Sequence, residues 1–364
     1  MIWLILGERA GDNAQVQALG RALGLPFTEK RLRYNKLARN NFSKLGPGLR
    51  SVDLARSDPL EPPWPDLVIA VGRRSVPVVQ WIRARSGGRT RLVQLGRPRA
   101  DLELFDLVVS TPQYGLPARR NVMLIEAPMV GLDQGAMARA AELWRPRLAH
   151  LPRPWIALLV GGRSKPYYLD ADGAARIARE AAAEANALGG ALLVTTSPRT
   201  PPEAADALFA AIDAPAYLHR FTPGGENPYH AFLALADRLI VTSESISMLT
   251  EAVLTGKPLE MALLPSEPAD WRKPKRKFYR WYLTRRRRQR FQGEQPNWLD
   301  RVFNLMVERG LLIPPRDIAT FNALLQANGL ATLLGRPGSE RGGMPARRLD
   351  DLDRVVARVR TLLD

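Results

Sequence analysis

One stretch decides how this chain of 364 residues is organised: Trp155-Ile156-Ala157-Leu158-Leu159-Val160-Gly161-Gly162. Six apolar residues in a row that end at a pair of glycines are typical of a strand buried on both faces of a parallel sheet and followed by a tight turn. The stretch comes directly after Leu151-Pro152-Arg153-Pro154. Two prolines cannot continue a helix, so this segment forms a stiff hinge. We infer that a second domain begins here.

Apolar runs of this kind alternate with helical segments along both halves of the chain. They predict strands at residues 2–6, 66–71, 91–95, 107–110 and 122–125, and again at 155–160, 191–195, 216–219, 239–242 and 259–263. This alternation predicts an α/β protein with two Rossmann-like domains that face a cleft. We place the N-terminal acceptor domain at 1–150, closed by a helix near 135–149. The C-terminal donor domain is placed at 151–345 with a basic insertion at 271–291, and residues 346–364 form a helix that could pack back on the N-terminal domain.

Composition excludes several kinds of site. The chain has no cysteine, which excludes disulfides, zinc–thiolate sites and cysteine nucleophiles and fits a reducing cytoplasm. It has three histidines, which argue against a polyhistidine metal centre, and we predict no metal or other cofactor. Neither a signal-peptide pattern nor an apolar run of about 18–20 residues is visible. We therefore expect a cytoplasmic protein that is soluble or held at the membrane surface.

Two turns in the first half follow predicted strands. In the first, Asp12, or with less support Glu8, is a candidate base that deprotonates an acceptor hydroxyl. Asp12 could equally be only a helix cap. Glycines in these turns let the backbone approach a ligand, and the cations and the hydroxyl suit an anionic acceptor or a phosphate. An ordinary capped turn with exposed arginines fits the second turn as well. These candidate acceptor residues are Asn13, Gly72, Arg73 and Ser75.

Three turns in the second half carry groups that suit a nucleoside diphosphate. Glycines, a hydroxyl and two cations follow the strand at 155–160, and hydroxyls with an arginine follow the strand at 191–195. Such groups at strand ends form diphosphate cradles, and a third turn could shape a base pocket or merely start a helix. The candidates are Gly161, Gly162, Ser164, Lys165, Thr196, Ser197, Arg199, Asn227, Pro228 and Tyr229.

The most informative motif is Thr242-Ser243-Glu244-Ser245-Ile246-Ser247-Met248-Leu249-Thr250-Glu251-Ala252. A strand ends at the start of this motif, and the serines that follow can cap a new helix. The positive N-terminal end of the helix dipole would then face the cleft. Ser247 and Glu251 are four apart and share one helix face. Glu251 is thus a candidate for binding the ribose hydroxyls, with Ser243, Ser245, Ser247 and Met248 near the phosphates. The alternative is a capping arrangement with Glu251 turned to solvent.

Together with Gly256-Lys257-Pro258, and with Gly11-Asp12-Asn13 and Gln15 in the first half, these motifs resemble the bacterial relatives of the plant mitochondrial-fission factor of the "elongated mitochondria" type. Those bacterial proteins are described as glycosyltransferases or nucleotide-sugar enzymes. The resemblance extends to about Leu264. It implies the two-domain GT-B fold, a donor nucleotide on the C-terminal domain with Glu251 at its ribose, and a base from the N-terminal domain. One departure is that Gln113-Tyr114 stands where the family pattern has a histidine.

A basic and aromatic segment lies between Trp271 and Phe291, with eleven Lys or Arg and no acidic residue. Without it, the net charge of +17 would fall to +6. Cations interleaved with aromatic rings suit an anionic membrane surface. Nucleic acid ranks second because no nucleic-acid fold motif accompanies the segment, and a solvated hairpin is a third possibility. The candidate patch comprises Arg272, Lys273, Lys275, Arg276, Lys277, Trp281, Arg285, Arg286, Arg287 and Arg288.

The function that fits these observations is metal-independent transfer of a sugar from a nucleoside-diphosphate-sugar to an acceptor hydroxyl. The acceptor is expected to be a membrane-associated glycolipid or a cell-envelope polysaccharide, and the protein to lie at the inner face of the cytoplasmic membrane. Two alternatives stay open: a nucleotide-sugar 2-epimerase on the same fold, and a non-enzymatic membrane-bound interaction protein on a degenerate transferase fold.

Overall fold

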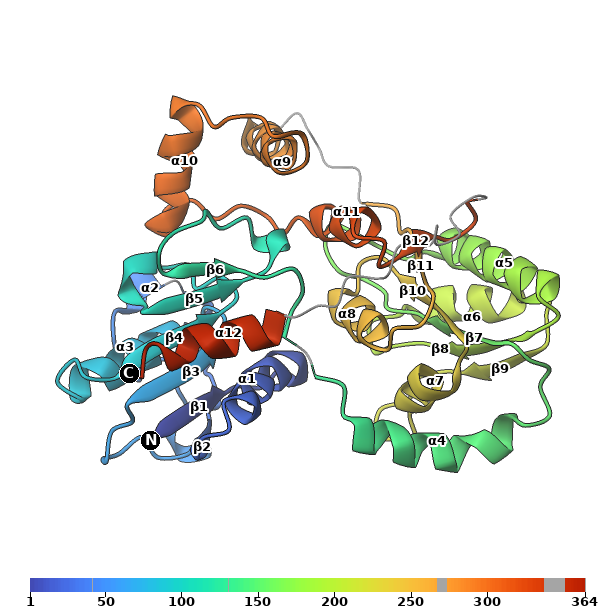
Figure 1. Ribbon diagram of the computed structural model, residues 1–364, viewed down its shortest axis with the longest axis horizontal. Coiled ribbons are helices and arrows are strands. Elements are labelled where there is room, and N and C mark those ends of the chain that lie inside the picture. The colour runs from blue at the N-terminus through green and yellow to red at the C-terminus, as the bar shows by residue number, and fades with distance from the viewer. Residues whose placement is uncertain (41, 130, 267–273, 337–350, 364) are drawn as a thin grey trace. The chain divides into compact units, whose positions relative to one another are not determined.

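The structure, a computed structural model, describes residues 1–40, 42–129, 131–266, 274–336 and 351–363. The chain divides into two compact units: unit 1 comprises residues 1–131, 272–321 and 349–364, and unit 2 comprises residues 132–271 and 322–348. Each unit contains one six-stranded sheet whose neighbouring strands are all parallel (Figure 1). The predicted α/β class with two Rossmann-like domains is therefore confirmed.

The sheet of unit 1 has the order β2-β1-β3-β4-β5-β6. Its strands are β1 (Ile2–Leu6), β2 (Phe27–Arg31), β3 (Leu67–Val71), β4 (Arg91–Leu95), β5 (Leu107–Ser110) and β6 (Val122–Leu124). Strand β2 lies on one side of β1, and β3 to β6 follow on the other side. The strand order therefore reverses between β1 and β3. Ligands of open α/β sheets bind beyond the carboxyl ends of the strands at such a switch point. The edge strand β2 was not predicted because its sequence FTEKR is mostly polar.

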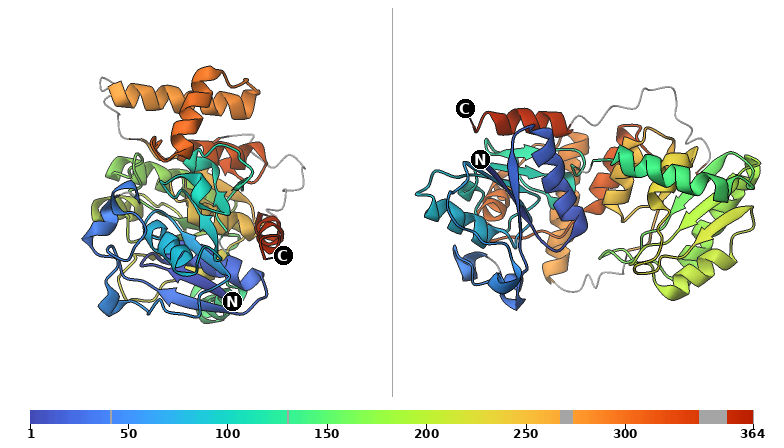
Figure 2. Two further views of the ribbon diagram at one scale, coloured as in Figure 1. Left: turned by 90° about the vertical axis from the view of Figure 1, so that its left-hand side faces the viewer. Right: turned by 90° about the horizontal axis from the view of Figure 1, so that it is seen from below.

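Helices cover both faces of this sheet. Alternate residues of β1 enter two different cores, with Leu4 and Leu6 in one and Trp3 and Ile5 in the other, as the period of a strand requires. The C-terminal helix α12 (Asp351–Arg360) packs beside α1 (Ala10–Ala22), as Figures 1 and 2 show. The remaining helices of this unit are α2 (Phe42–Leu45), α3 (Val76–Arg85), α9 (Pro274–Gln292), α10 (Trp298–Glu308) and α11 (Ile318–Ala327), the last of which crosses into unit 2.

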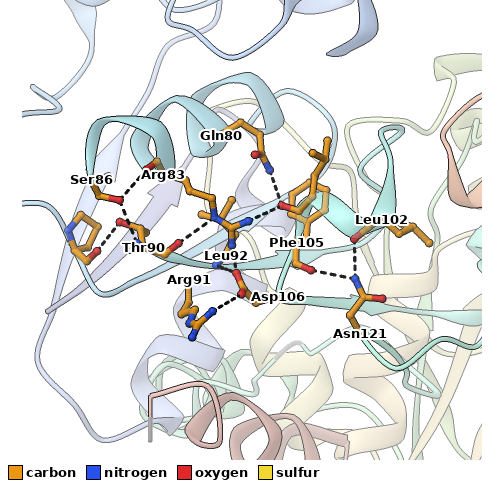
Figure 3. Close-up of polar contacts among 12 residues, drawn as sticks. Gln80, Arg83, Ser86, Thr90, Arg91, Leu92, Leu102, Phe105, Asp106 and Asn121 are labelled. Atoms are coloured by element: carbon orange, nitrogen blue, oxygen red, sulfur yellow. Dashed lines mark hydrogen bonds and ion pairs between the residues drawn. The ribbon is translucent and has the colours of Figure 1, made fainter. Parts of the chain in front are cut away.

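A polar network fixes the amino edge of the same sheet (Figure 3). Arg83 of α3 pairs with Asp106, which also accepts a hydrogen bond from the backbone N–H of Leu92 at 2.8 Å. Arg83 further donates to the carbonyl oxygen of Thr90 at 3.1 Å, and Gln80 donates to that of Leu104 at 2.7 Å. These contacts hold α3 against the starts of β4 and β5. The side chains at the amino edge are thus engaged in structural contacts. The carboxyl edge is the one available for a ligand.

The sheet of unit 2 has the order β12-β11-β10-β7-β8-β9, so its strand order reverses between β7 and β10. Its strands are β7 (Trp155–Leu159), β8 (Ala191–Thr195), β9 (Ala216–His219), β10 (Arg238–Thr242), β11 (Leu259–Ala262) and β12 (Thr332–Leu333). Its helices are α4 (Gln134–Leu148), α5 (Ala171–Ala187), α6 (Pro202–Ala210), α7 (Tyr229–Leu235) and α8 (Ile246–Leu254).

Two segments belong to a different unit from the one expected. Helix α4, which we expected to close the first domain, packs in unit 2, because Trp144 lies edge-on to Tyr217 and Phe232 with ring centroids 5.7 and 6.2 Å apart. The basic segment, expected as an insertion of the donor domain, contributes helix α9 to unit 1, because Tyr282 is buried in the core of that unit. The domain boundaries at 150 and 271 are corrected accordingly.

One half-buried acid, Glu184, makes the stability of unit 2 sensitive to pH. Arg238 lies 2.9 Å from a carboxylate oxygen of Glu184 and 3.1 Å from one of Glu260. Burial, with the negative charge of Glu260, raises the pKa of Glu184 from 4.5 to about 7. Because the folded protein then holds this proton more tightly than the unfolded chain, the contribution to stability is present below the unfolded pKa and is lost as pH rises through the folded pKa.

We predict that Glu184→Gln makes the protein more stable than the wild type at about pH 8, by roughly 1–3 kcal/mol, with no difference at about pH 4. Thermal unfolding across this pH range measures the effect. The matched control is Glu180→Gln on the same helix, whose carboxylate pairs with Arg176 at 2.9 Å. A stability difference between Glu184→Gln and the wild type that does not change with pH would contradict the assignment.

Candidate functional site

The carboxyl ends of β7, β8 and β10 are joined by direct hydrogen bonds. The N–H of Gly161 donates to the Thr242 hydroxyl at 2.8 Å, and the Ser197 hydroxyl donates to the Gly161 carbonyl oxygen at 2.7 Å. Thr200 also donates to that carbonyl oxygen. Three turns that are distant in sequence therefore meet at the switch point of the second sheet, where a ligand site was predicted.

Both glycines of the first turn are required because neighbouring atoms lie too close to leave room for a Cβ atom. A Cβ atom on Gly161 would clash with a carboxylate oxygen of Glu244, and one on Gly162 would clash with the backbone carbonyl of Arg199. The glycine pair thus lets the turn after β7 lie directly against the two other turns.

Glu244 occupies the centre of this arrangement. It is buried, and its Oε1 accepts the N–H of Gly162 at 2.6 Å. Burial raises the pKa of the carboxyl, while this hydrogen bond and the charge of Arg199 oppose the rise. Its Oε2 has no hydrogen-bond partner among the described residues. In this structure the Gly162 N–H, a predicted phosphate donor, is therefore taken by the protein's own carboxylate.

Arg199 places a positive charge at this edge of the sheet. Its guanidinium lies 3.9 Å from Glu244 and donates to the Ser245 hydroxyl at 3.0 Å. Ser245 is the residue before α8, and its side chain caps none of the N–H groups of that helix. An arginine and an uncapped helix start, both positive, thus lie side by side and suit the oxygens of a phosphate.

Glu251 and Tyr229 come together although they are 22 residues apart. The tyrosine hydroxyl donates to Glu251 Oε2 at 2.5 Å, and Asn227 fixes the start of α7 by accepting the Tyr229 N–H at 3.0 Å. Burial raises the pKa of Glu251, opposed by the Tyr229 hydrogen bond and the charge of His230. The carboxylate is thus half-buried and oriented by a neighbour, on the same helix whose first turn lies beside Arg199.

Other predicted donor residues have local partners instead. The Thr196 hydroxyl accepts the N–H of Phe221 at 2.9 Å, and the Ser243 hydroxyl accepts that of Leu264 at 3.1 Å. Ser164 pairs through its backbone with Tyr167, and Lys165 is exposed in that turn. Thr196 and Ser243 therefore stabilise the loops, whereas Ser247 is exposed and Met248 half-buried on the first turn of α8.

In unit 1 the two predicted turns line a cavity of about 90 Å³ beyond the ends of β1 and β3. Asn13 closes the first turn by bonding both backbone groups of Gly7, at 2.8 and 3.0 Å. The Ser75 hydroxyl bonds the carbonyl oxygens of Val71 and Gly72. Asn13 and Ser75 thus shape the turns. The charged side chains that line the cavity are Glu8, Arg9, Asp12, Arg73 and Arg74.

The two candidate bases differ in their surroundings. Glu8 lies 3.3 Å from Arg74 and 3.8 Å from Arg33, so its carboxylate is held in ion pairs. Asp12 has a looser contact, 3.9 Å from Arg9. Burial raises the pKa of Asp12, and the charges of Arg9, Arg316 and Arg74 oppose that rise. A carboxylate with a raised pKa and weak pairing is the better proton acceptor.

A buried arginine that the sequence motifs did not predict lies at the same edge. Arg97 follows β4, is 8% exposed, and donates to the carbonyl oxygens of Pro314 at 2.6 Å and Tyr114 at 3.3 Å. It has no ion pair among the residues that the structure describes, and its Nε is unpaired. Burial and the charge of Arg99 lower its pKa to about 10. The pattern Gly96-Arg97-Pro98-Arg99 directly after a strand was the available signal.

The comparisons with known proteins agree with this architecture. The profile of a family described as "Mitochondrial fission ELM1" matches residues 10–304. This chain belongs to that family. Arabidopsis thaliana mitochondrial fission protein ELM1 is 26% identical over 231 residues, which cover 57% of this chain and 53% of the plant protein. The chain thus spans about half the length of that relative. An uncharacterized protein of Rickettsia prowazekii is 23% identical over 299 residues, covering 73% of this chain and 84% of that protein.

Among solved structures, the chain is similar to UDP-GlcNAc 2-epimerase from Methanocaldococcus jannaschii. The TM-score is 0.50 at 12% identity, and 99% of each chain is covered. This likeness shows the fold, and this ELM1 family member has the two-domain GT-B fold that the motifs implied.

The ELM1 family match ends at residue 304, inside α10, and includes the basic helix α9. Arg285 pairs with Asp300 at 2.7 Å, Arg286 donates to Asn304 at 2.9 Å, and Arg287 pairs with Asp317. These three arginines of the predicted membrane patch thus contact unit 1 itself.

The rest of the patch is divided. Lys277, Trp281 and Arg288 are exposed, while Arg272, Lys273 and the side chains of Lys275 and Arg276 lie outside what the structure describes. No helix within the described part of the chain is long and apolar enough to cross a bilayer.

Proposed function

We propose that this protein is a glycosyltransferase that moves a sugar from a nucleoside-diphosphate-sugar to an acceptor hydroxyl. One observation carries the proposal: the uncapped first turn of α8 lies beside Arg199, and the same helix presents Glu251, oriented by Tyr229, within two turns. A diphosphate needs positive charge, and a ribose needs a hydrogen-bond acceptor for its hydroxyls. Helix α8 offers the positive charge at its first turn and the acceptor at Glu251.

In the proposed reaction, a bond forms between the acceptor oxygen and the anomeric carbon while the bond from that carbon to the diphosphate breaks. The leaving diphosphate gains negative charge, which Arg199 and the α8 dipole stabilise. Asp12 takes the proton of the acceptor hydroxyl. The solved structure of the same fold is named as an enzyme of a UDP-sugar, which supports a sugar nucleotide as the ligand here.

We further propose an acceptor with an anionic group, at the inner face of the cytoplasmic membrane, such as a glycolipid or a cell-envelope polysaccharide. The arginines around the unit 1 cavity support the anionic group. Arg9, Arg73 and Arg74 line that cavity, and burial together with the charges of Arg99, Arg74 and Arg9 lowers the pKa of Arg73. Such clustered positive charge is relieved by a phosphate.

We predict that ribose and phosphate recognition can be separated by mutation. Glu251→Ala should weaken binding of a nucleoside diphosphate at least ~10-fold, because it removes hydrogen bonds to a charged acceptor, and leave binding of inorganic pyrophosphate unchanged. Arg199→Ala should weaken both ligands. Isothermal titration calorimetry measures the two affinities.

Two further variants control this test. Arg179→Ala removes an exposed arginine of α5 and should behave as the wild type. Glu251→Gln keeps a partner for the Tyr229 hydroxyl, so it distinguishes loss of ribose binding from local disorder. Wild-type affinity of Glu251→Ala for every nucleoside diphosphate tested would refute the ribose role.

For the chemical step, Asp12→Asn should slow transfer to water in a panel of UDP-, GDP- and ADP-sugars by roughly 10²–10⁴-fold, with nucleoside diphosphate binding intact. Since the base acts only when ionised, the wild-type rate should fall as pH drops through the raised pKa of Asp12. Glu8→Gln is the matched comparison and should have a smaller effect. Nucleotide release is followed by a coupled assay.

The products of the same assay decide between the alternatives. A 2-epimerised sugar nucleotide formed without any acceptor would replace the transferase by an epimerase. Absence of both nucleotide binding and conversion would favour a non-enzymatic interaction protein. Equal rates for Asp12→Asn and the wild type would remove Asp12 from the reaction.

A further inference from the structure

Helix α10 turns its apolar face toward solvent, whereas an ordinary surface helix buries that face. Its outer face exposes Trp298 at 70%, Val302 at 45% and Leu305 at 48%, and Leu311 just beyond the helix is 74% exposed. The three helical residues are spaced four and three apart, so they form one stripe along the helix. A surface helix normally turns such residues to the core.

The acids of α10 lie on its inner face. Asp300 and Glu308 are both buried, Asp300 paired with Arg285 of α9 at 2.7 Å and Glu308 with Arg119. Between them Phe303 packs on Phe278 with ring centroids 4.9 Å apart. Charge pairs and aromatic packing thus fix which face of α10 points outward. The exposure of the apolar stripe is therefore set by this packing and does not reflect an arbitrary rotation of the helix about its axis.

The surroundings of the stripe are cationic. Arg301 is exposed within α10, and Lys277, Arg280 and Arg288 are exposed on α9, which crosses α10 (Figure 2). Helix α9 contains no acidic residue, and Glu294, the first acid after it, pairs with Arg285 at 2.8 Å. All exposed charged side chains of α9 and α10 within the described residues are therefore cations.

We propose that the outer face of α10 binds the surface of an anionic phospholipid bilayer, with Trp298, Val302, Leu305 and Leu311 at the boundary between headgroups and acyl chains. Contiguous exposed apolar residues mark an interaction site. Apolar residues including tryptophan, flanked by arginine and lysine, match a negatively charged interface. A protein groove would satisfy the apolar stripe, but the surrounding cations favour the lipid surface.

This proposal places the membrane contact on α10, whereas the sequence predicted it in the basic segment from Trp271 to Phe291. It rests on the membrane location in the proposed function but not on the donor site, so it is tested without substrate. The test uses the full chain with vesicles of equal parts phosphatidylcholine and phosphatidylglycerol, and with vesicles of phosphatidylcholine alone. Co-flotation measures the partition of protein between vesicles and solution.

We expect the wild type to partition at least ~10-fold better onto the mixed vesicles than onto the neutral ones. Trp298→Glu and Leu305→Glu should each reduce that partition ~10-fold or more, because a carboxylate in the stripe opposes both insertion and charge attraction. The matched control is Leu54→Glu, since Leu54 is 61% exposed elsewhere in unit 1, and it should bind as the wild type. Unchanged melting temperatures show that all three variants are folded.

Insertion depth gives a second readout. Lipids brominated near the headgroup should quench part of the tryptophan fluorescence of the wild type, and Trp298→Phe should lose that quenched part while it still binds vesicles. Unaltered binding by Trp298→Glu and Leu305→Glu, or quenching that persists in Trp298→Phe, would overturn the proposal. So would capture of nucleic acid or a protein by this face without any vesicle binding. Nucleoside diphosphate affinity should be the same in every one of these variants.

Discussion

The buried carboxylate of Glu244 is the constraint on which the candidate site depends. An ionised side chain away from water must be paired or hydrogen-bonded, since an uncompensated buried charge is costly. Oε1 of Glu244 meets this requirement with the Gly162 N–H at 2.6 Å and with Arg199 at 3.9 Å. Arg199 in turn donates to Ser245 at the start of α8. One acid therefore orders the turns after β7, β8 and β10 and places a guanidinium beside an open helix start.

Much of this arrangement could be predicted, because apolar runs mark buried strands and parallel strands bring their carboxyl ends to one edge. The two strands that escaped prediction lacked that signal: β2 is polar and β12 has only two residues. At the site, the direction in which each side chain points could not be predicted from the sequence. Spacing could not show that the Thr196 and Ser243 hydroxyls bind backbone N–H groups, or that Glu244 and Arg97 turn inward.

The arginines illustrate the same limit for charge. The sequence shows how many cations a segment carries, but tertiary contacts decide which remain available. Arg285 and Arg287 of α9 pair with Asp300 and Asp317, so part of the local positive charge is neutralised within unit 1. Arg97, in contrast, is buried beside backbone carbonyls and pairs with no carboxylate in the part of the chain that the structure describes. Both switch points, one in each sheet, thus present positive groups at the edge where open α/β sheets bind ligands.

We infer that the first turn of α8 receives the phosphates of a nucleotide. Hydrogen exchange of the backbone amides tests it directly, because the N–H groups at residues 246–248 have no cap from Ser245 and would gain a bound acceptor. A saturating nucleoside diphosphate should slow exchange at this turn by an order of magnitude or more. Unchanged exchange at residues 246–248, with slowing confined to other loops, would show that the phosphates bind elsewhere.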